Sequence, residues 1–172
     1  RALGQLSPQA ESPAAAELTP RCCALQPHSK WYPPGMSGRI LIVDDDPDVL
    51  RLVERQLARV GMKPVLASNG AEASAAFQAG DLSAVILDLD LPDTTGKELL
   101  SEFQALLPDL PVLVLTASES LDDAVECMRL GAVDFIVKPF DRIRLVTSLR
   151  NATIQGRLRA RVTTLNRELH GA

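Results

Sequence analysis

The feature that most constrains the fold is a pattern that begins at Arg39, in which short apolar runs alternate with longer amphipathic stretches. Several of the apolar runs consist almost entirely of Val, Ile and Leu, which is typical of strands covered on both faces. The stretches between them carry apolar residues at helical spacing. The sequence therefore predicts repeated strand–helix units around a parallel sheet, an α/β fold. The predicted strands are 39–43, 63–67, 84–87, 112–115 and 134–137, and the predicted helices are 47–60, 70–79, 96–107, 121–130 and 141 onward.

A chain of 172 residues has room for one domain with appendages. Its first 35 residues hold six of the 12 prolines and show no sustained period, so we interpret them as a disordered leader or an added extension ahead of a natural start at Met36. The alternative is a regulatory tail that docks through Trp31 and Tyr32. The predicted segments are a leader at 1–35, a globular domain at 36–155 and a connector or dimerisation helix at 156–172.

The charge balance restricts the partners of the chain. A net charge of -4 and a pI of about 5.2 do not favour nucleic acid or an anionic membrane as a direct partner. No apolar run approaches the ~20 residues of a membrane helix, and no secretion signal opens the chain, so we expect a cytoplasmic protein. Cys22, Cys23 and Cys127 have the spacing of neither a metal site nor a disulfide framework, and we expect free thiols.

The last segment continues the helical pattern with apolar residues at spacings of 4, 3 and 4, which form a short heptad seam: Leu158, Val162, Leu165 and Leu169. Seven arginines after position 140 leave a nucleic-acid contact open. No aromatic residue follows Phe140, however, and the arginines are spread around the helix. We therefore favour a connector or dimerisation helix without direct nucleic-acid contact.

Polar side chains follow four of the predicted strands at the point where each strand ends. Because the carboxyl ends of parallel strands meet at one edge of the sheet, we expect these side chains to converge on one crevice. In strand order they are Asp44 and Asp45 after the first strand, Asp88 after the third, Thr116 after the fourth and Lys138 after the fifth.

Three close carboxylates need a divalent cation to remain ionised together, and Mg²⁺ prefers oxygen ligands. We expect Asp45 and Asp88 to bind the metal directly and Asp44 to hold a metal-bound water. With the metal present, the Asp88 carboxylate can attack phosphorus as a nucleophile. Lys138 and Thr116 would then contact the phosphoryl oxygens.

Each of these residues also has a simpler interpretation. Asp44 and Asp45, together with Asp46, can form an acidic helix start in which Asp46 caps the first turn and Pro47 takes its favoured first position. For Asp46 we prefer that interpretation. Asp88 can begin a turn, Thr116 can cap a helix, and Lys138 can be a surface lysine. Their joint occurrence after successive strands favours a common site.

Four motifs of the chain, in order, resemble the signatures of response-regulator receiver domains over about residues 38–155. They are Val43-Asp44-Asp45, Asp88-Leu89-Asp90-Leu91-Pro92 with Gly96, Leu115-Thr116-Ala117, and Phe135-Ile136-Val137-Lys138-Pro139-Phe140. The resemblance implies a flavodoxin-like (βα)5 fold, which is a doubly wound parallel five-stranded sheet with strand order 2-1-3-4-5. An extended C-terminal helix would follow it.

The resemblance also implies the chemistry of two-component signalling. A sensor histidine kinase would donate a phosphoryl group, Mg²⁺ would be required, and Asp88 would become an aspartyl phosphate. Asp44 and Asp45 match the family's acidic pair, and Asp90 would offer its backbone carbonyl to the metal. Lys138 matches the phosphate-contacting lysine. Such a domain is not an enzyme beyond catalysing its own phosphorylation and dephosphorylation.

Thr116 and Phe135 match the family's switch pair, which implies that the face formed by the fourth helix, fifth strand and fifth helix changes on phosphorylation. Phe135 lacks the hydroxyl of the tyrosine often found there, so the switch must work through packing. A cis peptide bond is expected before Pro139. We expect a phosphorylation-dependent homodimer through this face or the terminal helix. Residues 141–169 are similar to the connector that joins NtrC-like receivers to an ATPase domain, and no such output domain follows. The chain is then either truncated or a short regulator, and we expect truncation because the heptad seam is left unused. DNA contact would be possible through the missing output domain.

Two other functions stay open. Asp88-Leu89-Asp90 imitates the nucleophile and acid/base pair of haloacid-dehalogenase-type phosphatases, although Pro92 stands where that motif expects Thr or Val. The second alternative is a receiver-like module that acts by binding alone, without phosphorylation.

Overall fold

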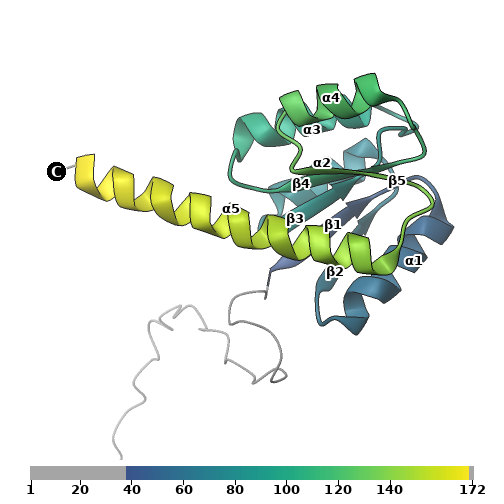
Figure 1. Ribbon diagram of the computed structural model, residues 1–172, viewed down its shortest axis with the longest axis horizontal. Coiled ribbons are helices and arrows are strands. Elements are labelled where there is room, and N and C mark those ends of the chain that lie inside the picture. Colours follow the sequence, from purple (N-terminus) through teal and green to yellow (C-terminus); the bar gives the residue numbers. More distant parts are fainter. Residues whose placement is uncertain (1–37, 171–172) are drawn as a thin grey trace, which may run out of the picture. The chain divides into compact units, whose positions relative to one another are not determined.

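The computed structural model describes residues 38–170, so the predictions for residues 1–35 lie outside the described residues. Within this range five strands and five helices alternate along the chain (Figure 1). They are β1 (Arg39–Val43), α1 (Pro47–Arg59), β2 (Lys63–Ala67), α2 (Gly70–Gln78), β3 (Leu82–Leu87), α3 (Gly96–Leu106), β4 (Val112–Thr116), α4 (Leu121–Arg129), β5 (Asp134–Val137) and α5 (Arg142–His170).

The five strands form one sheet in the order β2-β1-β3-β4-β5, and each neighbouring pair is parallel. This confirms the predicted fold class and strand order. In the middle of the sheet, Leu41 of β1 lies beside Val65 of β2 and Val85 of β3. The chain leaves β1 toward one edge of the sheet and β3 toward the other, so the loops diverge between β1 and β3. This is the switch point where open parallel sheets hold their sites.

Helices cover both faces of the sheet, as Figure 1 shows. Successive residues of β1 alternate between the two cores: Leu41 packs with residues of α2, α3 and α4, whereas Ile42 packs with residues of α1 and α5. Both residues are fully buried. This cover on both sides explains why β1, β3 and β4 carry runs of Val, Ile and Leu rather than alternating apolar and polar residues.

The helix ends agree with the predicted capping. The Asp46 side chain accepts a hydrogen bond from the backbone N–H of Asp48, and Pro47 is the first residue of α1. The simpler interpretation of Asp46 as a helix cap is therefore confirmed.

At the other end of the domain, α5 continues without a break through Gly156 to His170. The added Cβ of a residue at 156 would lie 2.8 Å from the backbone oxygen of Asp109, so glycine lets this helix approach the loop before β4.

Replacing Gly96 with Ala is expected to destabilise the domain by about 2 kcal/mol, because the new Cβ cannot be accommodated without moving the backbone. It would lie 2.1 Å from the backbone oxygen of Asp88 and 2.7 Å from the Cα of Leu89. The control is Gly80→Ala, where no atom lies within 4 Å of the added Cβ and only the positive φ of 73° opposes the substitution. The control should cost about 1 kcal/mol. Urea denaturation measures both, and equal midpoints for the two variants would contradict the close approach at Gly96.

Candidate functional site

The predicted site residues are held at the carboxyl edge of the sheet because the hydrogen-bond ladder continues past the strand ends. The backbone N–H of Asp88 donates to the Val43 oxygen at 2.9 Å, and the N–H of Lys138 donates to the Thr116 oxygen at 2.8 Å. The backbone N–H of Asp44 donates in the same way to the Ala67 oxygen of β2 at 3.1 Å. Each side chain therefore starts from a backbone position fixed by the neighbouring strand.

Lys138 joins the ends of β1 and β3. Its ammonium nitrogen lies 2.5 Å from Asp44 Oδ2 and 2.6 Å from Asp88 Oδ2. The two aspartates are almost completely buried, with 2% and 5% of their surfaces exposed. The cis peptide bond predicted between Lys138 and Pro139 is present. The sequence-distant residues 44, 88 and 138 thus form one buried charged cluster.

Asp45 completes an acidic group with Asp44 and Asp88. Each of the three offers a carboxylate oxygen, and these oxygens all lie within 4.8 Å of one another. Asp45 is exposed, whereas its two neighbours are buried, so the group is open to solvent on one side. Mg²⁺ prefers hard oxygen ligands and retains several water ligands. The carboxylate oxygens and the solvent access of this group therefore fit Mg²⁺.

Burial and ion pairing have opposing effects on the pKa values of Asp44 and Lys138. Burial raises the pKa of Asp44 above its ordinary value, although the hydrogen bonds from Lys138 and from the Asp46 backbone N–H oppose this. For Lys138, burial alone would lower the pKa, but the hydrogen bonds to Asp44 and Asp88 outweigh it and raise the pKa. Lys138 therefore stays protonated and is the cation that balances the buried carboxylates.

The other predicted residues lie around this cluster in different ways. Thr116 is fully buried at the end of β4, and its hydroxyl accepts a hydrogen bond from the Ser118 N–H at 3.2 Å. Asp90 is exposed and forms an isolated bridge with Thr95 in the loop between β3 and α3. Phe135, beside Val114 in the sheet, is partly buried and packs against the core that α2, α3 and α4 cover. The roles of these three residues stay predictions.

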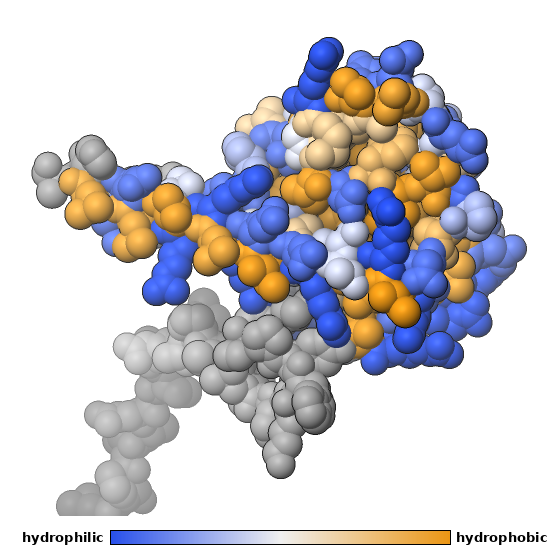
Figure 2. All heavy atoms as spheres, viewed as in Figure 1, coloured by the Kyte–Doolittle hydropathy of each residue, from blue (hydrophilic) through white to orange (hydrophobic). Residues whose placement is uncertain are grey.

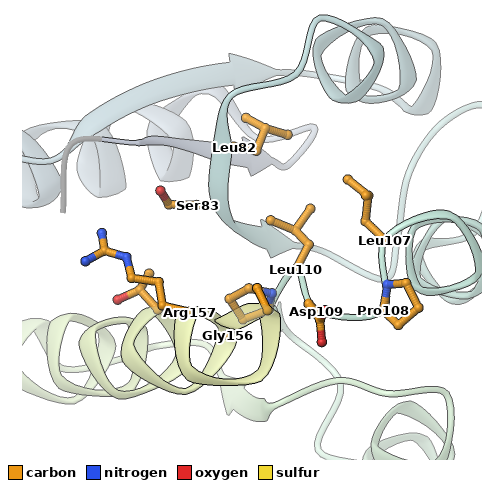
Figure 3. Close-up of a pocket in the computed structure, with 11 residues that line it drawn as sticks. Leu82, Ser83, Leu107, Pro108, Asp109, Leu110, Gly156 and Arg157 are labelled. Carbon is orange, nitrogen blue, oxygen red and sulfur yellow. The ribbon is translucent and has the colours of Figure 1, made fainter. Parts of the chain in front are cut away.

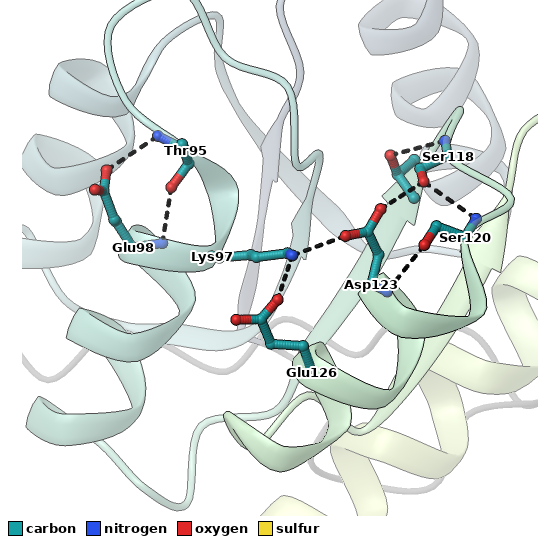
Figure 4. A network of polar contacts seen from close by, with 8 residues as sticks. Thr95, Lys97, Glu98, Ser118, Ser120, Asp123 and Glu126 are labelled. Carbon is teal, nitrogen blue, oxygen red and sulfur yellow. Dashed lines mark hydrogen bonds and ion pairs between the residues drawn. The ribbon is translucent and has the colours of Figure 1, made fainter.

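Sequence reasoning missed a polar network beside the site, which joins α3 to α4 (Figure 4). Lys97 on α3 contacts Asp123 and Glu126 on α4, and Asp123 also accepts a hydrogen bond from Ser118. Lys97 and Asp123 are 26 residues apart. No spacing rule links such positions, so only the folded arrangement shows the contact.

A cavity of about 290 Å³ lies at the opposite edge of the sheet (Figure 3). Leu82 and Ser83 at the start of β3, Pro111 before β4, and Gly156 and Arg157 of α5 are among the residues that line it. It contains none of the predicted site residues, and apolar surface dominates its lining. The charged cluster at the carboxyl edge is therefore the better candidate for chemistry.

The fold and this charged crevice define the class of the protein, a flavodoxin-like α/β protein of the CheY type. The family model for the response regulator receiver domain matches residues 40–150. The chain belongs to this family and carries a receiver domain of two-component response regulators. This assignment leaves the haloacid-dehalogenase interpretation without support.

Curated relatives include transcriptional regulators. PrrA of Mycobacterium tuberculosis is 39% identical over 114 residues, which cover 66% of this chain and 49% of that protein. GlrR of Escherichia coli K12 is 35% identical over 118 residues, which cover 69% of this chain and 27% of that protein. The chain thus spans about half, or less, of the length of these relatives.

Solved structures agree with the fold. A CheY-like receiver domain from Methanospirillum hungatei is similar with a TM-score of 0.68 and 28% identity, covering 72% of this chain and 98% of that one. NtrX from Brucella abortus, in complex with ATP, is similar with a TM-score of 0.70 and 33% identity, covering 75% of this chain and 30% of that one. Between residues 38 and 170, no helix has both the length and the apolar character needed to cross a bilayer.

Proposed function

We propose that this receiver domain takes a phosphoryl group on Asp88 from a sensor histidine kinase, in a reaction that requires Mg²⁺, and that the modification controls dimerisation and a transcriptional output. The observation that carries the proposal is the cluster in which Lys138 contacts both Asp44 and Asp88 while Asp45 stands within 4.8 Å. The matching relatives PrrA and GlrR are named as transcriptional regulatory proteins, which supports the output.

In the proposed transfer, an oxygen of the Asp88 carboxylate attacks phosphorus. A P–O bond forms, the P–N bond to the kinase histidine breaks, and the departing imidazole keeps the electron pair. Bound Mg²⁺, held by Asp45, Asp88 and the Asp90 backbone carbonyl, with Asp44 holding a metal-bound water, would offset the charge that builds on the transferring group. Lys138 lies 2.6 Å from an Asp88 oxygen, which supports the proposal that its ammonium group contacts a phosphoryl oxygen after the transfer.

Phosphorylation is proposed to act through Thr116 and Phe135. The Thr116 hydroxyl turns toward the phosphoryl oxygens, and Phe135 moves further inward to fill the space that it leaves. Because Phe135 has no hydroxyl, packing alone transmits the change to the face formed by α4, β5 and α5. This face exposes apolar side chains that a partner could cover, among them Leu121 and Met128 of α4 and Ile143 of α5.

Incubation with acetyl phosphate and Mg²⁺ tests the proposed chemistry. A receiver accumulates a covalent acyl phosphate that is stable in acid and labile in base, and chelation of the metal prevents its formation. A binding module that needs no phosphorylation gains no mass, and a phosphatase releases inorganic phosphate without accumulating the adduct. Either of the last two results would contradict the proposal.

The proposed dimer uses the exposed apolar seam of α5. Leu158, Val162 and Leu165 are exposed at 60%, 56% and 49%, and Leu169 and Ile154 extend the same row. Figure 2 shows this row as orange residues along the projecting half of the helix. Apolar residues at heptad spacing lose their contact with water when a second copy of the same helix packs against them.

Beryllofluoride, which mimics a bound phosphoryl group, is expected to shift the protein from monomer to dimer in sedimentation velocity experiments. Val162→Glu places a charge inside the seam and should weaken the dimer about tenfold or more. Thr163→Glu adds the same charge one residue along, on the exposed side of the helix away from the seam, and should leave the dimer intact. An unchanged sedimentation coefficient of the wild type, or equal effects of the two variants, would count against this interface.

A further inference from the structure

A chain of polar contacts leads from α3 to the residue that is proposed to sense the phosphoryl group. Lys97 Nζ lies 2.8 Å from Asp123 Oδ1 and also contacts Glu126. The other oxygen of Asp123 accepts a hydrogen bond from Ser118 Oγ at 2.7 Å. The Ser118 N–H then donates to Thr116 Oγ1 at 3.2 Å. We call these five residues the Lys97 network, and Figure 4 shows its links around Asp123.

The network fixes the start of α4 as well as the loop before it. Ser120 caps α4 by accepting a hydrogen bond from the Asp123 N–H, and its own N–H donates to Ser118 Oγ at 3.2 Å. The side chains of Lys97 and Asp123 are 28% and 30% exposed, so water screens their attraction only in part. Hydrogen bonds to Asp123 and Glu126 raise the pKa of Lys97, while those from Lys97 and Ser118 lower the pKa of Asp123. Both partners therefore remain charged at neutral pH.

The network also borders the loop that carries the proposed phosphoacceptor. A pocket of about 230 Å³ lies between the two, and its lining includes Leu89 and Asp90, which follow Asp88, together with Lys97, Ser118 and Asp123. The Thr116 hydroxyl is engaged with the Ser118 N–H on the network side. Turning that hydroxyl toward a phosphoryl group on Asp88 requires it to give up this hydrogen bond.

We propose that Lys97 is a positioning residue for the phosphoacceptor site: through Asp123 and Ser118 it holds the Thr116 hydroxyl in its unphosphorylated orientation. The inference rests on the proposed function of Asp88, because Thr116 has to respond to a group bound there. A contact made only in the unphosphorylated arrangement favours that arrangement, so its removal shifts the equilibrium toward the phosphorylated one. Lys97 thereby sets how readily the domain responds.

Calorimetric titration with beryllofluoride in the presence of Mg²⁺ tests the role of Lys97. Lys97→Met and Asp123→Asn are expected to bind the mimic roughly two- to fivefold more tightly than the wild type, the size expected from a partly exposed ion pair. Both variants should also melt at a lower temperature. A purely structural contact would lower the melting temperature without raising the affinity. The matched control is Asp122→Asn, which removes the same charge from the exposed neighbouring position of α4, and its affinity should equal that of the wild type.

The Thr116→Ala background gives a second readout, because it removes the hydroxyl through which the network acts. In that background Lys97→Met should no longer change the affinity for beryllofluoride. Wild-type protein that fails to bind the mimic would overturn the proposed function of Asp88 and this inference with it. Wild-type binding combined with equal or weaker binding by Lys97→Met and Asp123→Asn would overturn the role of Lys97 alone.

Discussion

Asp88→Asn is expected to abolish the mass gain that acetyl phosphate and Mg²⁺ produce in the wild type, a loss of about a hundredfold or more in phosphorylation rate. The amide of asparagine is not a nucleophile toward phosphorus, whereas the carboxylate is. The substitution keeps the size of the side chain and an oxygen that can accept the Leu89 N–H, which donates to Asp88 Oδ1 at 2.6 Å. The loop after β3 should therefore keep its conformation, which circular dichroism checks. Intact-protein mass spectrometry measures the phosphorylation.

Asp90→Asn is the matched control for this experiment. Asp90 stands two residues further along and is exposed, and only its backbone carbonyl is assigned a role, which asparagine retains. Phosphorylation should stay within about twofold of the wild type. A haloacid-dehalogenase mechanism would instead need the Asp90 carboxyl as its acid and base. Loss of phosphorylation in Asp90→Asn, or phosphorylation of Asp88→Asn at the wild-type rate, would contradict the assignment of Asp88 as the phosphoacceptor.

Lys138→Met is expected to lower the free energy of unfolding by about 3 kcal/mol at neutral pH without Mg²⁺, because it leaves two buried carboxylates without their cation. Only 2% and 6% of the side chains of Asp44 and Asp88 are exposed, so water cannot replace the ammonium group. Adding Mg²⁺ should recover part of the lost stability, since an ion that binds only the folded state stabilises it. Urea denaturation with and without the metal measures both effects.

The pH dependence of this effect follows from the direction of the pKa shifts. The pKa of Lys138 is raised above 10.5, so its contribution is complete below that pH and declines as the pH rises further. The pKa of Asp44 is raised above 3.8, so Asp44 begins to take up protons above that value. A neutral carboxyl needs no cation, so the difference in stability between wild type and variant should narrow as the pH falls through the raised pKa of Asp44. The control is Lys63→Met, at an exposed position of β2, which should hardly change the free energy of unfolding. An equal loss of stability in Lys63→Met and Lys138→Met would contradict the buried pairing.

The sequence predicted the central strands well because burial on both faces leaves an apolar run in β1, β3 and β4. β1, β2 and β5 have the predicted bounds, and β4 extends one residue further, to Thr116. β3 begins at Leu82, two residues earlier than predicted; the prediction missed this start because the polar Ser83 interrupts the apolar run. Strand order is a property of pairing between distant segments, and it was predicted only through the resemblance to receiver domains.

The central part of the site was predictable because strand ends place their residues automatically at one edge. Asp44, Asp88 and Lys138 each follow a strand directly, and the structure brings them into contact. The contacts of Lys97 were not predictable, because two helices had to be packed side by side before Lys97 could reach Asp123. The exposed seam of α5 was visible in the sequence as a heptad pattern, and the structure leaves its side chains exposed.

The most direct measurement of the central claim is to locate the phosphoryl group on the wild-type chain. The protein is treated with acetyl phosphate and Mg²⁺, and borohydride then reduces any acyl phosphate, which converts an aspartyl phosphate to homoserine. Tandem mass spectrometry of the peptides identifies the converted position. We predict homoserine at residue 88 and at no other aspartate. Conversion at another position, or a stable phosphoryl gain with residue 88 intact, would contradict the claim that Asp88 is the phosphoacceptor.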